Sequence, residues 1–294
     1  MRKGIVDRNF LCGLVGAGIQ HSASPSIHMA EARALSLAYR YVLLDLDAAD
    51  GTTHALPELL RRCEAEGYTG LNVTFPCKQE IIPLLTTLSP EARALNAVNT
   101  VVFRDGERIG YNTDCSGFAE NFRRGLSDAR RRRVVLMGAG GAGAAVGYAA
   151  LELGVQHLEI FDHVRERASA LALRLAALHP EARVTVGDDL AASLHESDGL
   201  IHATPTGMPK MPGLPVPAQS IQPDLWVAEV VYVPLETELL SLARQRGCRT
   251  LDGGGMVVFQ AAASFALFTG LEPDRERMLR HFARLVEAPA LAAG

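Results

Sequence analysis

The sequence predicts an α/β protein of two domains, in which an N-terminal α/β domain precedes a Rossmann domain that binds a dinucleotide. Strand-like and helix-like segments alternate along most of the 294 residues, which is the pattern of α/β folds. A glycine-rich turn near residue 140 follows a strand-like run and leads into a helix-like run, as in Rossmann domains. After residue 256 the chain becomes helical, and we expect these helices to return to the first domain.

The first predicted domain comprises residues 1–117 and is completed by residues 256–294. Asp105 and Gly106 form a two-residue turn of the kind that joins the strands of a β-hairpin. Strand-like runs occur at 11–15, 39–44, 70–74, 97–103 and 109–111, and helix-like runs at 26–35, 56–63, 256–268 and 273–286.

The second predicted domain, residues 118–255, follows a helix that begins near Gly117. The proline-rich segment 208–217 predicts a loop at the carboxyl edge of its sheet. We expect the active site in the cleft between the two domains, because pockets commonly form at such interfaces. Six strands, the number in a Rossmann sheet, are expected near residues 134, 157, 183, 199, 227 and 249.

The glycine-rich turn indicates a site for a pyrophosphate. Glycines let the backbone approach a phosphate closely, and a helix N-terminus offers unpaired N–H groups and a positive dipole end. The strand before the turn and the helix after it make this pattern specific. The residues expected to contact the cofactor are Gly138, Ala139, Gly140, Gly141, Ala142 and Gly143.

Asp162 ends the second strand of the Rossmann domain, about 20 residues after the turn. A carboxylate in this place accepts a hydrogen bond from the ribose 2′-hydroxyl and repels a 2′-phosphate. The sequence therefore predicts NAD as the cofactor, with NADP as a weaker one. Arg165 and Arg167 follow closely; they either attract a phosphate or lie on a solvated helix face.

Lys78 and Asp114 are the predicted catalytic residues. Each follows an apolar or glycine-containing stretch and lies among short polar side chains, as expected where a strand ends and a pocket begins. A lysine held by a carboxylate can pass a proton to or from a substrate hydroxyl. Taken alone, Lys78 would equally fit a solvated surface lysine.

The bulk composition excludes several functional classes. A net charge of −4 gives no nucleic-acid footprint, and we interpret the run Arg130–Arg133 as a solvated turn. No apolar run reaches the length of about 18 residues that a membrane span needs. The N-terminus lacks the apolar core of a secretory signal, so a cytoplasmic location is expected.

Five cysteines, without CxxC or histidine spacing, argue against a disulfide framework and a zinc site, so no metal is expected. Cys77 and Cys115 each adjoin a predicted catalytic residue. We hypothesise that a nearby ammonium lowers the pKa of such a thiol and makes it reactive. The alternative is that both thiols only fill space in the core.

Several further motifs occur in a fixed order along the chain. They are His21-Ser-Ala-Ser-Pro25, Asn72-Val-Thr-Phe-Pro-Cys-Lys78, Ala97-Val-Asn-Thr100, Asn112-Thr-Asp114 with Gly117-Phe118, Ala203-Thr-Pro-Thr-Gly-Met208, Val231-Tyr-Val-Pro-Leu-Glu-Thr237, and Asp252-Gly-Gly-Gly-Met256 leading to Gln260. With the glycine turn, they make the chain resemble shikimate dehydrogenases over essentially its whole length. The resemblance is stronger to the NAD-preferring quinate/shikimate dehydrogenase branch.

The resemblance implies a set of site residues. The hydroxyls of Ser22 and Ser24 would bind the substrate carboxylate, although each serine alone would also fit a helix cap. The residues implied around the ring hydroxyls, beside the catalytic pair Lys78 and Asp114, are Thr74, Asn99 and Gln260. Those implied along the cofactor are Pro205, Val230 and Gly253 at the nicotinamide half and Arg167 near the adenosine half.

The implied reaction interconverts shikimate and 3-dehydroshikimate, with Lys78 exchanging the hydroxyl proton and Asp114 orienting it. Some members that use quinate well carry threonine at the position of Ser24, so quinate and 3-dehydroquinate are expected to be weaker substrates or none. His163 stands where NADP-dependent members usually carry an arginine, which favours NAD and a catabolic role.

Other readings stay open at the level of sequence. The substrate could be a modified ring such as an aminoshikimate, or the enzyme an ordinary NADP-linked biosynthetic one. From a different class, the chain could be an NAD-binding sensor without catalysis, or its Rossmann domain could bind another nucleotide-like ligand such as a methyl donor. The expected partner is a small cyclic hydroxy acid, and both a monomer and a homodimer are compatible with the pattern.

Overall fold

The computed structural model describes residues 9–47 and 56–287, so the N-terminal segment on which the absence of a secretory signal was judged lies outside the described residues. The chain divides into two compact units, residues 1–113 with 260–294 and residues 114–259. Both divisions fall inside a helix, in α5 (Thr113–Gly125) and in α10 (Gly254–Thr269). No break in composition marks such a point, and the predicted limits of 117 and 255 each differ from these divisions by four residues.

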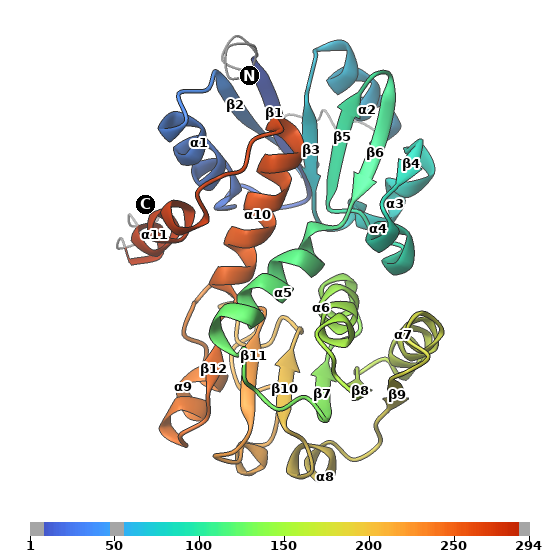
Figure 1. The fold of residues 1–294 in the computed structure, drawn as a ribbon, viewed down its shortest axis with the longest axis vertical. Coiled ribbons are helices and arrows are strands. Elements are labelled where there is room, and N and C mark those ends of the chain that lie inside the picture. Colours follow the sequence, from blue (N-terminus) through green and yellow to red (C-terminus); the bar gives the residue numbers. More distant parts are fainter. Residues whose placement is uncertain (1–8, 48–55, 288–294) are drawn as a thin grey trace. The chain divides into compact units, whose positions relative to one another are not determined.

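The first unit contains a mixed six-stranded sheet with the order β2-β1-β3-β5-β6-β4 (Figure 1). β1 pairs in parallel with β2 and β3, whereas β5 is antiparallel to both β3 and β6. The turn between β5 and β6 holds Asp105 and Gly106 at φ of 52° and 78°, as the predicted hairpin requires. The strands are β1 (Phe10–Gly16), β2 (Tyr39–Asp45), β3 (Gly70–Val73), β4 (Thr87–Leu88), β5 (Thr100–Arg104) and β6 (Glu107–Tyr111).

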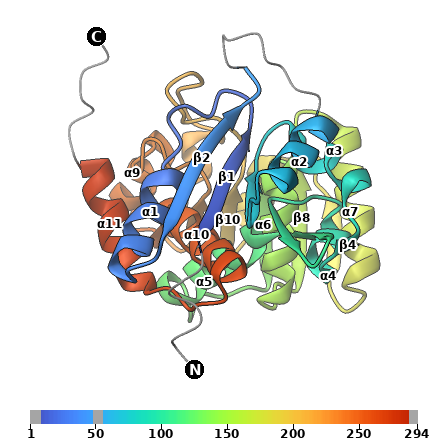
Figure 2. The same cartoon turned by 90° about the horizontal axis from the view of Figure 1, so that it is seen from above.

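Helices from both ends of the sequence cover the first sheet. The ring of Phe268, in α10, fills the space over Gly70, where a Cβ would meet that ring. Helix α1 packs beside β2, and α11 lies beside α1 (Figures 1 and 2). The remaining helices are α1 (Ser24–Ala34), α2 (Leu56–Ala65), α3 (Cys77–Glu80), the 3-10 turn η1 (Ile82–Leu84), α4 (Pro90–Leu95) and α11 (Arg275–Glu287).

The second unit is built on an all-parallel six-stranded sheet with the order β12-β11-β10-β7-β8-β9. This is the strand order of a Rossmann domain, and the predicted α/β class with two sheets is confirmed. The strands are β7 (Arg133–Met137), β8 (His157–Phe161), β9 (Arg183–Val186), β10 (Gly199–His202), β11 (Trp226–Glu229) and β12 (Thr250–Leu251); the further helices are α6 (Gly141–Glu152), α7 (Arg165–Leu178), α8 (Leu190–His195), the 3-10 turn η2 (Ala218–Ser220) and α9 (Glu238–Gln245).

Some elements differ from the prediction. The short strand β4 and helix α4 were not predicted, and the strand expected at 97–103 begins only at Thr100. Asn96 closes α4 in the left-handed region, at φ 51°, so the residues after it connect the two elements. Helix α5 starts at Thr113, four residues before Gly117, which places Asp114 in the first helical turn rather than at a strand end.

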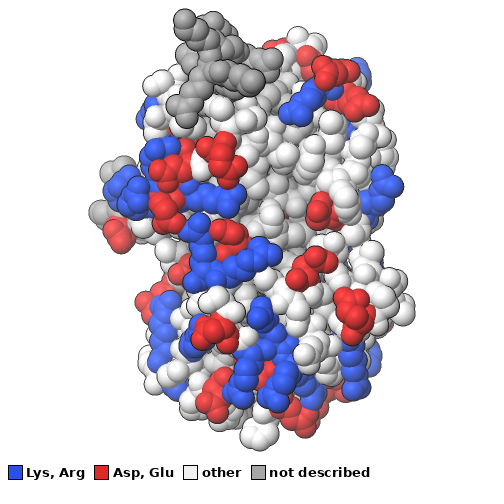
Figure 3. All heavy atoms as spheres, in the orientation of Figure 1, with Lys and Arg blue, Asp and Glu red and all other residues white. Residues whose placement is uncertain are grey.

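The arginine run 130–133 forms ion pairs with acidic side chains, which the interpretation as a solvated turn did not include. Arg132 pairs with Asp198 at 3.2 Å, and Arg133 pairs with Glu159 at 2.8 Å. Acidic and basic side chains are interspersed on the face that Figure 3 shows. Among the helices of the described residues, none combines the length and apolar character that a membrane crossing requires.

Candidate active site

The glycine turn after β7 has the geometry of an anion site. Gly138 has φ +99°, and a Cβ on it would come within 2.6 Å of the Ala203 carbonyl oxygen. A Cβ on Gly143 would overlap the carbonyl of Gly138, whereas the space over Gly140 is open. Helix α6 begins after Gly140, which has no side chain to cap its first N–H groups. The turn therefore fits a pyrophosphate, since uncapped N–H groups border open space.

Asp162 follows β8 and lies beside this turn. Its Oδ2 accepts a hydrogen bond from the Ala139 backbone N–H at 2.7 Å, and its Oδ1 accepts one from Val164 at 2.8 Å. The side chain is only 6% exposed. Arg165 forms an exposed ion pair with Asp188 at 2.6 Å, while Arg167 lies exposed on the first turn of α7.

The residues implied at the nicotinamide half follow three neighbouring strands. Pro205 comes after β10, Val230 after β11 and Gly253 after β12, and these strands are parallel. A Cβ on Gly253 would meet the carbonyl oxygen of Val230 within 2.4 Å, so these two residues are in contact. All three lie at the carboxyl edge of the sheet, where doubly wound folds bind their ligands.

In the first unit, the residues implied around the substrate gather at one edge of the sheet. The carboxyl ends of β1, β3 and β6 meet the amino end of β5 there, because β5 is antiparallel to β3 and β6. The residues placed at this edge are Ser22, Ser24, Thr74, Lys78, Asn99 and Thr113.

A buried hydrogen-bonded chain supports Asn99 at this edge. Asn99 Oδ1 accepts from the Thr113 backbone N–H at 2.8 Å and from the Thr100 hydroxyl at 3.0 Å. Asn72 donates to Thr100 Oγ1 at 3.1 Å, and the Tyr41 hydroxyl donates to Asn72 Oδ1 at 2.8 Å. Tyr41 was not among the predicted residues.

The two serines differ in their surroundings. Ser22 Oγ accepts a hydrogen bond from the Ser24 backbone N–H at 3.3 Å, and Ser24 is the first residue of α1. The N-cap of α1 is Ala23, with no side-chain cap, so neither serine is the N-cap itself. The Ser24 side chain also contacts the Tyr41 hydroxyl.

The predicted catalytic residues each lie in a helix that follows a strand. Lys78 lies in α3 and is half-buried, and its backbone carbonyl accepts from the Val98 N–H at 2.8 Å. Asp114 is 8% exposed in the first turn of α5, directly after Thr113, which Asn99 holds. Gln260 is half-buried in α10 and belongs to the first unit.

The hypothesis of an activated thiol is wrong for Cys77. Burial and, to a smaller extent, the Glu80 carboxylate raise the pKa of the Cys77 thiol to about 11, which is opposite to the expected effect of an ammonium. Cys115 is buried as well, at 5% exposure. In the described part of the chain, no group of three or more His, Cys, Asp or Glu side chains is placed to hold a metal ion.

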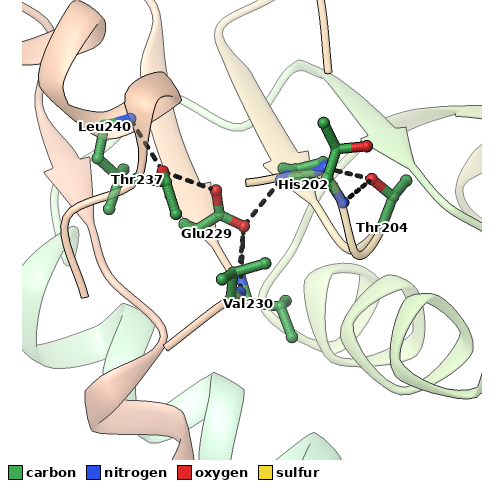
Figure 4. Close-up of polar contacts among 8 residues, drawn as sticks. His202, Thr204, Glu229, Val230, Thr237 and Leu240 are labelled. Atoms are coloured by element: carbon green, nitrogen blue, oxygen red, sulfur yellow. Dashed lines mark hydrogen bonds and ion pairs between the residues drawn. The ribbon is translucent and has the colours of Figure 1, made fainter. Parts of the chain in front are cut away.

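Sequence reasoning also missed a buried polar network at the carboxyl edge of the Rossmann sheet (Figure 4). It centres on His202 and Glu229, the last residues of β10 and β11, which are 0% and 2% exposed. A polar residue at the end of an otherwise apolar strand was the available signal in both cases.

Comparisons with known proteins agree with this arrangement. A model described as "Shikimate dehydrogenase substrate binding domain" matches residues 14–101, and one described as "Shikimate 5'-dehydrogenase C-terminal domain" matches residues 253–281. The chain is 52% identical over 285 residues to a shikimate dehydrogenase (NADP(+)) of Streptomyces avermitilis, covering 96% of this chain and 98% of the relative.

Relatives linked to the other cofactor are also similar. The chain is 43% identical over 284 residues to a quinate/shikimate dehydrogenase (NAD(+)) of Corynebacterium efficiens, covering 94% and 99% of the two chains. The solved structure of quinate dehydrogenase from Corynebacterium glutamicum in complex with NAD matches with a TM-score of 0.90 at 42% identity, covering 94% of this chain and 99% of that one. The matches thus include both cofactor branches, and the expected NAD branch is not singled out by them.

Proposed function

The chain belongs to the shikimate dehydrogenase family and is an NAD(P)-dependent oxidoreductase acting on a CH–OH group, and from this premise we propose that it interconverts shikimate and 3-dehydroshikimate with NAD preferred over NADP. In this proposal the first unit binds the substrate and the second unit binds the cofactor.

The observation that carries the substrate proposal is the polar edge of the first sheet. Residues with hydroxyl or amide side chains follow β1, β3 and β6 and precede β5 at this edge, and Asn99 is held in place by Thr100 and Thr113. A small polyhydroxylated acid offers a hydrogen-bonding group on almost every carbon. A pocket that pairs each of these groups rejects analogues that leave one of its own groups unpaired.

Lys78 and Asp114 carry the proton transfer in this proposal. In the oxidation, the neutral amine of Lys78 accepts the proton of the ring hydroxyl, and Asp114 orients both groups. A nicotinamide held by the residues of the second unit would supply the acceptor for the hydride of the same carbon. In the reduction, the Lys78 ammonium returns the proton to the carbonyl oxygen.

The second unit supplies the residues that would hold the cofactor. The uncapped N–H groups at the start of α6 face the open space over Gly140 and would take the pyrophosphate. Pro205, Val230 and Gly253 would border the nicotinamide half, and Arg167 the adenosine half.

The preference for NAD rests on the Asp162 carboxylate. It lies beside the glycine turn, nearly buried, and both of its oxygens accept backbone N–H groups. A ribose 2′-hydroxyl can donate to a remaining lone pair, whereas a 2′-phosphate would meet a negative charge. His163, 83% exposed, does not replace the arginine that NADP-linked members usually carry.

The test is a set of initial rates, followed through the absorbance of the reduced nicotinamide, with shikimate and with quinate, each against NAD and NADP. We expect shikimate with NAD to give the highest kcat/KM and quinate to be weaker. Faster turnover with NADP would reject the role of Asp162 and indicate the biosynthetic type. Absence of turnover in all four combinations would instead point to a modified ring.

A further inference from the structure

The network around Glu229 is a complete set of hydrogen bonds inside the second unit (Figure 4). Glu229 Oε1 accepts from His202 Nδ1 at 2.8 Å and from the backbone N–H groups of Val230 and Val231, each at 3.1 Å. Its Oε2 accepts from the Thr237 hydroxyl at 3.1 Å. All four partners donate, so the carboxylate form satisfies every one of them.

The carboxylate also determines which nitrogen of His202 carries the hydrogen. Because the carboxylate of Glu229 accepts, the hydrogen lies on His202 Nδ1, and the other ring nitrogen, Nε2, lies 2.5 Å from Thr204 Oγ1. Thr204 Oγ1 in turn accepts from the Thr206 backbone N–H at 3.3 Å. The network therefore runs from the end of β11 into the loop after β10.

That loop, Thr204–Met208, touches the glycine turn of the predicted cofactor site and the residue before α9. A Cβ built on Gly138 would lie 3.1 Å from the Thr204 methyl carbon, so the loop packs on the glycine turn. Gly207 has φ +96° and packs on Thr237, whose side chain a Cβ would meet at 3.3 Å. Thr237 is also the N-cap of α9, since its Oγ1 accepts from the Leu240 N–H at 3.2 Å.

A buried pair of ionisable groups, such as His202 and Glu229, is weak evidence that the pair stabilises the fold. Removing two ionisable groups from water costs free energy that an apolar pair of similar volume avoids. What the network does provide is a fixed distance between the ends of β10 and β11. The network holds Thr204, which precedes Pro205, and Val230. Pro205 and Val230 are both assigned to the nicotinamide half.

We propose that His202 and Glu229 are positioning residues, which hold the Thr204–Met208 loop and the Val230–Val231 segment in register against the nicotinamide half of the cofactor. This inference rests on the proposed function, because it assigns these two segments to the nicotinamide. Neither His202 nor Glu229 exchanges a proton with the substrate; they act through the backbone that they hold. Loss of the hydrogen bonds between His202, Glu229 and these segments should misplace the nicotinamide ring more than it weakens cofactor binding, because the pyrophosphate site stays intact.

The test variant is Thr204→Val in the full chain, which keeps the shape of the side chain and removes the bond to His202. The matched control is Thr185→Val. Thr185 Oγ1 bonds His157 Nε2 at 2.8 Å between β8 and β9, in the same unit and away from the nicotinamide residues. Both variants lose one bond between a threonine and a histidine, and Thr204→Val also loses the bond from the Thr206 N–H at 3.3 Å.

The first readouts need no substrate: the affinity for NADH, the fluorescence of the bound reduced nicotinamide, and the thermal midpoint. For Thr204→Val we expect an NADH affinity within about threefold of wild type and fluorescence shifted towards that of free NADH. With substrate, we expect kcat to fall about tenfold and the isotope effect from a deuterated carbinol carbon to rise. Thr185→Val should match wild type in all of these.

Unchanged fluorescence and kcat in Thr204→Val would overturn the proposal. So would losses of kcat, NADH affinity and thermal midpoint that run in parallel, since these describe a purely structural role. If Thr204→Val does not fold, Glu229→Gln, which keeps the volume of the side chain, is judged by the same readouts. If the wild type oxidises neither shikimate nor quinate, the proposed function fails, while the NADH fluorescence still tests this inference separately.

Discussion

Ala139 donates its backbone N–H to the carboxylate of Asp162 at 2.7 Å, and this bond joins the glycine turn after β7 to the end of β8. The residue assigned to cofactor selection is thus tied directly to the turn assigned to the pyrophosphate. A change at Asp162 should alter the choice between cofactors more than the reaction itself.

Asp162→Asn is therefore expected to reduce the ratio of kcat/KM for NAD over NADP by at least about tenfold, because it removes the charge that a 2′-phosphate would meet. Initial rates with both cofactors measure this ratio. Asp189→Asn is the control, since Asp189 caps α8 in the same unit by accepting from Ala192 at 3.1 Å. A ratio that stays at the wild-type value would show that Asp162 does not select the cofactor.

Lys78→Ala should lower kcat by at least about a hundredfold while NADH affinity stays within about twofold of wild type, because general acid–base catalysis is lost and the second unit is unchanged. Turnover and NADH titration measure the two quantities. Arg93→Ala removes an exposed cation from the same unit and should retain wild-type rates. More than about a tenth of wild-type activity in Lys78→Ala would contradict the assignment.

Tyr41→Phe should raise the KM for shikimate about fivefold and leave the KM for NAD unchanged. The variant removes the donor to Asn72 Oδ1, which lies 2.8 Å from the Tyr41 hydroxyl, and an unpaired buried acceptor costs about 1 kcal/mol or more. Tyr39→Phe is the matched control from the same strand, since its hydroxyl bonds His28 Nδ1 at 2.9 Å instead. Equal effects of both substitutions on KM would argue against a role for Tyr41 in the site.

His28 should make the first unit sensitive to acid. It is fully buried, and desolvation lowers its pKa from 6.5 to about 3, so the unfolded chain binds the proton more readily. Above pH 6.5 the protonation of His28 does not reduce the free energy of unfolding. As the pH falls from 6.5 towards 3, it reduces this free energy by about 1.4 kcal/mol per pH unit. Denaturant unfolding of wild type and His28→Gln at pH 7 and pH 5 should show a smaller loss in the variant. An equal loss would contradict this, and the exposed His163→Gln should behave as wild type.

Arg277→Ala should destabilise the protein by about 3 kcal/mol, because it leaves the buried carboxylate of Glu31 without its cation. Arg277 binds Glu31 through Nε at 2.8 Å and Nη2 at 2.6 Å, and Glu31 is 1% exposed. Arg275→Ala breaks the exposed pair with Glu272 and should change the free energy of unfolding by less than about 1 kcal/mol. Comparable losses in the two variants would contradict the prediction.

Much of the fold could be predicted from sequence, because local signals carried it. A pattern of only a few residues predicts each of the six strands of the second sheet, the hairpin at Asp105–Gly106 and the glycine turn. Helix limits were less predictable. The start of α5 at Thr113 depends on contacts with Asn99, which no local pattern reveals.

The sequence by itself determined the α/β class and the Rossmann turn, because glycine spacing and strand periodicity are local properties. It also determined the family, because several short motifs occur in a fixed order along the chain. Only the tertiary structure brought Tyr41 to Asn72 and His202 to Glu229. Tyr41 meets Asn72 across 31 positions and His202 meets Glu229 across 27. Such pairs form where parallel strands come into register, and the register is decided by the packing of whole sheets rather than by the residues on either side.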